Sequence, residues 1–172
     1  MNLTDDDFTL FGLTPRFALD RQALDAQWRA LQGEVHPDRF VGEGGAAQRI
    51  AMQWAVRVNE AYQRLKDPLK RGAYLCELRG APIHAERNTA MPGPFLMQQM
   101  SWREALEEAT DLKAVERLDD SVATHESALL AELGVLLDDR NDASAAAQQV
   151  RALMFTAKFR DDIRRRLEAL DD

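Results

Sequence analysis

Apolar residues recur at three- and four-residue steps along most of this chain, and this periodicity constrains the fold more than any other feature. Residues 46–66 carry Ile50, Trp54, Val58, Ala61 and Leu65 at such steps, which is the spacing of one face of an α-helix. Strand-like alternation is absent, β-branched residues are sparse, and Ala, Leu, Gln, Glu and Arg dominate. We therefore predict an all-α fold.

Caps, prolines and glycines divide this pattern into separate helices. We predict helices over residues 7–11, 21–35, 46–66, 68–78, 94–109, 112–137 and 143–170, with the segment VGEGG as a loop. Asp20 and Asp111 are expected to cap the helices that follow them, and Pro37 is expected to stop the second helix. Two further apolar stripes are Leu24, Trp28 and Leu31, and Leu112, Val115, Leu118, Val122, Leu129, Leu133 and Leu136.

The interval RGAPIHAERNTAMPGP is rich in Gly and Pro and is the expected domain boundary. We predict an N-terminal domain over residues 1–78, a linker over 79–93 and a C-terminal domain over 94–172. Two long helices of the first domain are expected to form a hairpin with short flanking helices. Short connections between long amphipathic helices predict an antiparallel three-helix bundle for the second.

Composition excludes several classes of function. The single Cys76 excludes a Cys-x-x-Cys zinc site and a set of thiolates for an iron–sulfur cluster, and we expect neither metal nor cofactor. Of 29 acids and 22 bases, residues 1–79 hold 11 of each, which leaves 18 acids and 11 bases in the second half. This acidic half argues against nucleic acid as a partner. No apolar run is long enough for a membrane span, and no signal peptide is recognisable, so we expect a cytoplasmic protein.

The segment GEVHPDRF, residues 33–40, places three constrained residues at the end of a predicted helix. Three interpretations compete. Pro37 and Asp38 are typical helix-stop and turn residues. His36 offers a metal ligand or a catalytic base, although no partner stands at ligand spacing. Finally, the tip of a helical hairpin is exposed, and a carboxylate there can pair with an arginine of a partner.

Three segments in order, FTLFGL, HPDRF and VNEAYQRLKDPLKRGAYL, resemble the J domain, by which DnaJ-type co-chaperones contact DnaK-type chaperones. The resemblance covers residues 1 to about 78. It implies that His36, Pro37 and Asp38 stimulate ATP hydrolysis by the chaperone, with Asp38 contacting one of its arginines. Arg29 and Arg39 are the accompanying chaperone-binding candidates. J domains have a strongly basic second helix, whereas here Arg21 and Arg29 are offset by Asp25 and Glu34.

The helix PFLMQQMSWREALEEA carries two apolar faces. At roughly 100° per residue, Phe95, Trp102, Leu106 and Ala109 share one side, which a three-helix bundle needs. Leu96, Met97, Met100 and Glu104 lie on another side, and Phe155 is displaced from the apolar side of its own helix in the same way. Such surplus residues either fill gaps in the bundle or form a methionine-rich binding patch.

A J domain followed by FLMQQMSWREALEE and an acidic helical tail resembles the HscB family, the co-chaperones of bacterial iron–sulfur cluster biogenesis. This resemblance implies that the first domain engages the chaperone HscA and the second binds the cluster scaffold protein IscU. It also implies the scaffold-binding set Leu96, Met97, Met100, Glu104 and Phe155. Ser101 stands where an acidic residue is common.

Two other functions stay open at this point. One is a general DnaJ-type co-chaperone that serves a DnaK-type chaperone with a different client. The other is a helical enzyme that uses His36 with nearby carboxylates, which would require a pocket and a perturbed histidine. We expect no enzymatic activity.

Overall fold

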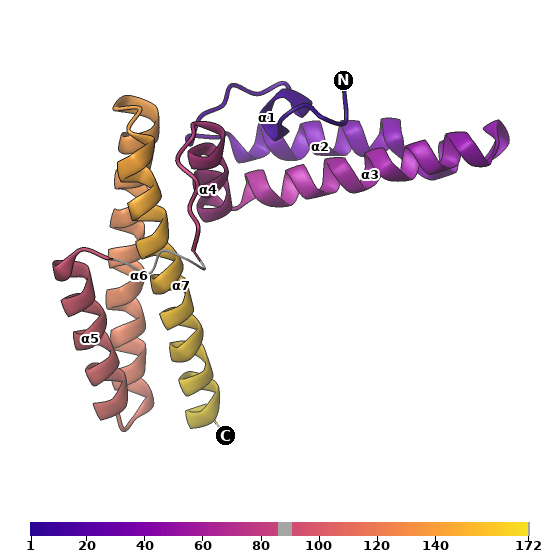
Figure 1. The fold of residues 1–172 in the computed structure, drawn as a ribbon. Coiled ribbons are helices and arrows are strands. Elements are labelled where there is room, and N and C mark those ends of the chain that lie inside the picture. The colour runs from indigo at the N-terminus through magenta and orange to yellow at the C-terminus, as the bar shows by residue number, and fades with distance from the viewer. Residues whose placement is uncertain (86–90, 172) are drawn as a thin grey trace. The chain divides into compact units, whose positions relative to one another are not determined.

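A computed structural model describes residues 1–85 and 91–171, and within these ranges the only regular elements are helices. The all-α prediction is confirmed for this part of the chain. In order, the elements are α1 (Asp7–Leu10), α2 (Arg21–Val35), η1 (Pro37–Glu43), α3 (Gly45–Lys66), α4 (Pro68–Leu78), α5 (Gly93–Glu108), α6 (Leu112–Gly134), η2 (Val135–Asp139) and α7 (Ala143–Asp171) (Figure 1).

The chain divides into two compact units, Met1–Leu75 and Cys76–Asp172. The division falls within α4, close to the predicted end of the first domain at residue 78. The predicted linker, residues 79–93, includes residues 86–90, which lie outside the described residues. The domain limits at residues 78 and 94 therefore stay a prediction.

The first unit is a hairpin of α2 and α3 with α1 packed on α3 (Figure 1). Asp20 caps α2 as predicted, since its Oδ1 accepts the backbone N–H groups of Gln22 and Ala23. The hairpin buries residues from both helices, and Trp28 stacks on Tyr62 with ring centroids 4.5 Å apart. Its fully buried core residues include Leu24, Val58, Ala61 and Leu65.

In the second unit, α6 runs antiparallel to both α5 and α7 (Figure 1). Asp111 caps α6 as predicted, with its Oδ1 2.8 Å from the Ala114 nitrogen. A core cluster joins the three helices through Trp102, Val115, Val122, Phe159 and Ile163. Arg79 and Arg151 donate to the carbonyls of Leu137 and Ile83, and thereby attach the segment that follows α4 to this bundle.

Three details of the predicted pattern were wrong. The segment 41–43, predicted as loop, belongs to a 3₁₀ helix, because Pro37 starts a turn in which the Arg39 N–H donates to the His36 carbonyl. Ile50 and Leu112, both predicted in apolar stripes, are 55% and 37% exposed. The helix predicted to end at residue 137 changes at Val135 into one π-helical turn, which directs both Leu136 and Leu137 into the core.

Candidate functional site

The His-Pro-Asp tip, residues His36, Pro37 and Asp38, follows directly on α2. The helix ends at Val35 because a residue before proline avoids helical geometry, and His36 accordingly adopts φ −60° and ψ 127°. Since α2 and α3 pack against each other as a hairpin, the tip lies at the end where they are joined. His36 and Asp38 are exposed there, which confirms the predicted placement of the tripeptide.

The imidazole of His36 holds the tip in shape. Its Nδ1 accepts the backbone N–H of Asp38 at 3.2 Å, a local contact of side chain to backbone that closes the turn. The Asp38 Oδ2 lies 3.6 Å from the same nitrogen, a contact that is an ion pair only when the imidazole is protonated. Asp38 keeps 86% of its side chain exposed. The arrangement therefore fixes the turn and presents the carboxylate to solvent.

The two arginines predicted to accompany the tip differ in their surroundings. Arg39 turns back, and its Nη1 donates to the Gly33 carbonyl at 2.8 Å, which satisfies an acceptor in the last turn of α2. Arg29 is exposed on α2. Arg39 thus has a structural contact within the hairpin, and a role of either residue in binding a chaperone stays a prediction.

A polar cluster joins the first turns of α2, at the end away from the tip, to α3. Asp25 accepts hydrogen bonds from Arg21 Nε at 2.8 Å and from the Tyr62 hydroxyl at 2.7 Å. These bonds, the Arg21 one first, hold the pKa of the Asp25 carboxyl below its usual value. Because Arg21 is engaged in this way, Arg29 is the remaining basic residue of α2 outside the cluster. The weakly basic character expected from the sequence is therefore found in the structure.

The methionine face, defined as Leu96, Met97, Met100 and Glu104 on α5, is open to solvent. Leu96 is 48% exposed, Met97 73% and Met100 64%, and Glu104 is exposed beside them. The other side of α5 buries Gln99 and Trp102. The prediction of a surplus apolar face that the bundle does not use is confirmed for the α5 residues.

Phe155 on α7 lies level with the methionine face. Arg103 of α5 approaches Asp162 at 3.9 Å and the Phe159 ring at 5.9 Å, and α5 and α7 run in the same direction (Figure 1). Leu96 precedes Arg103 by seven residues, and Phe155 precedes Asp162 by seven, which on each helix is two turns or roughly 10 Å. Leu96 and Phe155 therefore lie at the same height along the bundle. Phe155 is half-buried. A shared binding site of the predicted residues, beyond this common level, stays a prediction.

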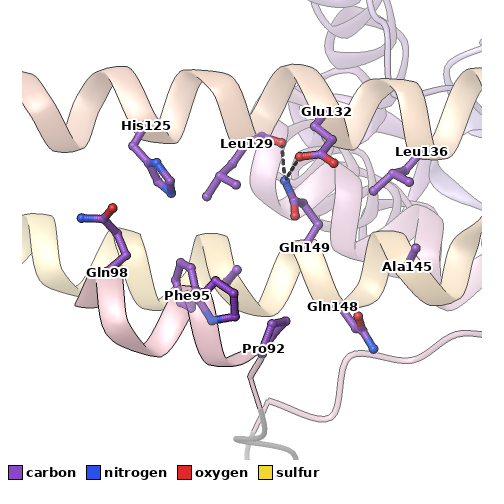
Figure 2. Close-up of a pocket in the computed structure, with 12 residues that line it drawn as sticks. Pro92, Phe95, Gln98, His125, Leu129, Glu132, Leu136, Ala145, Gln148 and Gln149 are labelled. Atoms are coloured by element: carbon purple, nitrogen blue, oxygen red, sulfur yellow. Dashed lines mark hydrogen bonds between the residues drawn. The ribbon is translucent and has the colours of Figure 1, made fainter. Parts of the chain in front are cut away.

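A groove of about 670 Å³ between α5, α6 and α7 was not predicted. Figure 2 shows His125 and Gln98 on its walls, and the Gln149 amide donating to Leu129 and Glu132. The His125 Nε2 is buried and has no hydrogen-bond partner among the described residues. The groove exists because α5 is shorter than the helices it covers, which the pattern of a single helix does not show.

Residues 1–85 and 91–171, the part of the chain that the structure describes, also bear on other functions. They contain no group of three or more His, Cys, Asp or Glu side chains placed to hold a metal ion. No helix in this part of the chain combines the length and apolar character that crossing a bilayer requires.

Comparisons with known proteins give consistent matches. Residues 91–164 match the family model described as the HSCB C-terminal oligomerisation domain. The co-chaperone protein HscB homolog of Burkholderia mallei is 52% identical, and the match covers 99% of each chain. The chaperone HscB from Vibrio cholerae is 37% identical with a TM-score of 0.83, covering 96% of this chain and 99% of that one. Human co-chaperone HscB has a TM-score of 0.90 at 25% identity, covering 96% and 84%.

An N-terminal J-like hairpin with an exposed His-Pro-Asp tip, followed by a helical bundle, defines a J-domain type of co-chaperone. The 52% sequence identity to the Burkholderia mallei protein, over 99% of both chains, is well above the identity at which only the fold is shared. The chain belongs to the HscB family of co-chaperones.

Proposed function

We propose that this chain is a co-chaperone of iron–sulfur cluster assembly that is not itself an enzyme and acts in the cytoplasm. Its J-like hairpin stimulates the ATPase of the DnaK-type chaperone HscA, and its bundle binds the scaffold protein IscU and delivers it. The observation that carries the proposal is an exposed His-Pro-Asp tip in a member of the HscB family.

The first step of the proposal is contact with the chaperone through Asp38. An exposed carboxylate on a rigid turn can form a charge-assisted hydrogen bond with an arginine of a partner. The His36 contact with the Asp38 N–H and the fixed φ of Pro37 reduce the conformational entropy that binding would otherwise cost. His36 thereby has a structural role in the tip, which disfavours the alternative of an enzyme that uses it as a base.

The second step is capture of the scaffold by the methionine face and Phe155. Burying an exposed large apolar side chain at an interface contributes about 1.5–3 kcal/mol, and methionine adapts its shape to the partner. The carboxylate of Glu104, at the edge of this face, can pair with a basic group of the scaffold and so orient the bound scaffold. Holding scaffold and chaperone on one chain raises the effective concentration of each near the other.

Titration calorimetry of IscU into the full chain tests the second step. The Met97→Ser, Met100→Ser double variant removes two exposed side chains, so we expect an unchanged fold and binding weakened at least about 100-fold. Val135→Ser is the matched control, because Val135 is also exposed, at 39%, in the same unit. Unweakened binding by the double variant would reject the assigned face, and no binding by the wild-type chain would favour a general DnaJ-type co-chaperone with another client.

A further inference from the structure

A shallow groove opens beside the His-Pro-Asp tip, between the end of α2, η1 and the start of α3. Its volume is about 300 Å³. The larger apolar lining residues are Val35, Phe40, Ile50 and Trp54, and the acidic ones are Glu34 and Glu43. We call this the tip groove.

The tip groove follows from the unequal lengths of the two hairpin helices. The helix α3 has 22 residues and α2 has 15, so at 1.5 Å per residue α3 is longer by roughly 10 Å. The short η1 packs against α3 at this end, yet it leaves Ile50 55% exposed. An apolar side chain that continues the core stripe of α3 is thus presented to solvent directly beside the tip.

The charged residues that line the tip groove, Glu34 and Glu43, are both acidic. Glu34, Asp38 and Glu43 are all exposed. The guanidinium of Arg39 keeps its positive charge, but it donates to the Gly33 carbonyl and is not among the lining residues. Arg49 lies roughly 100° around α3 from Ile50 and does not line the groove. A complementary partner surface is therefore an apolar side chain flanked by basic residues.

We propose that the tip groove receives an apolar side chain, flanked by Lys or Arg, from the chaperone that the tip contacts. This inference rests on the proposed function and extends its first step from one carboxylate to a surface. An apolar contact supplies affinity, whereas the acids give orientation and partner choice.

The test is the stimulation of HscA ATPase by the full chain, titrated to give the concentration for half-maximal effect. Ile50→Ser is expected to raise that concentration at least about 10-fold. Met52→Ser is the matched control: Met52 is 58% exposed on the same helix and lies roughly 160° around it. We expect less than about a 2-fold change there. Both substitutions replace an exposed side chain, so we expect both variants to fold, and circular dichroism checks this.

A charge variant and a tip variant separate the possible failures. Glu34→Gln with Glu43→Gln is expected to raise the half-maximal concentration about 3-fold or more at low salt and less at high salt. If Asp38→Asn abolishes stimulation while Ile50→Ser and Met52→Ser behave alike, the tip groove is rejected and the proposed function stands. If the wild-type chain gives no stimulation, both are rejected.

Discussion

The most informative change for stability is Asp7→Asn, at the first residue of α1. The Asp7 carboxylate is fully buried and pairs with Arg57 Nη1 at 2.8 Å and Arg64 Nε at 3.2 Å. Its backbone N–H donates to the Tyr74 hydroxyl, a bond that the substitution leaves in place. Asparagine keeps the shape of the side chain but leaves two guanidinium groups without the negative charge that compensates them.

The structure sets the size of the effect. Removing one partner of a buried ion pair costs about 3–5 kcal/mol. The Arg57 and Arg64 side chains are 19% and 39% exposed, so solvent screens part of their charge. Arg57 also donates to the Leu3 and Asp5 carbonyls. We therefore take the lower end, about 3 kcal/mol. For a unit of this size that corresponds to a loss of roughly 12–24 °C in Tm.

Thermal unfolding followed by tryptophan fluorescence measures this loss in the first unit alone. The chain has three tryptophans, and in a Trp102→Phe background the remaining Trp28 and Trp54 both lie in Met1–Leu75. Asp5→Asn is the control, because its carboxylate accepts only the nearby Asn2 N–H among the bonds described and an amide oxygen can replace it. A Tm for Asp7→Asn within about 4 °C of this control would refute the reasoning from the buried pair.

Three further predictions concern single positions. Gly33→Ala should stabilise the first unit by about 0.5–1 kcal/mol in thermal unfolding, because alanine loses less conformational freedom in a helix than glycine. A Cβ there meets no atom within 4 Å, and a loss of stability would contradict this prediction. Asp111→Ala should destabilise the second unit by about 1 kcal/mol through loss of the α6 cap, measured by thermal unfolding with circular dichroism. Burial raises the pKa of the Cys76 thiol from 9.0 to about 11, so alkylation at mildly alkaline pH should be about 100-fold slower than in denaturing urea. The same shift makes the free energy of unfolding depend on pH. The contribution of the Cys76 thiol to stability is fully present below its unfolded pKa of 9.0 and is lost as the pH rises towards its folded pKa of about 11.

The helices and their ends were predictable because their causes are local. Asp20 and Asp111 cap the helices they were expected to cap, and Pro37 ends α2 at Val35, since each effect acts within a few residues. The same holds for the exposure of Met97 and Met100, which follows from the angular positions of neighbours on one helix.

Features that depend on contacts between distant segments were not predictable. No pattern near Asp7 in the sequence indicates that its carboxylate is buried, whereas in the structure it pairs with arginines more than 45 residues away in the sequence. Ile50 fits the apolar stripe of α3, and its exposure depends on where α2 ends beside it. The level of Phe155 beside Leu96 likewise depends on the register of α5 against α7.

The central claim is that one chain couples a scaffold to a chaperone, and the ATPase rate of HscA in the presence of IscU tests it most directly. We expect wild-type chain and IscU together to accelerate hydrolysis more than the sum of their separate effects. Asp38→Asn should abolish the contribution of this chain while leaving its IscU binding intact, and Met97→Ser with Met100→Ser should remove the synergy while leaving stimulation by the chain alone. Equal rates with wild-type chain and with Asp38→Asn would contradict the account.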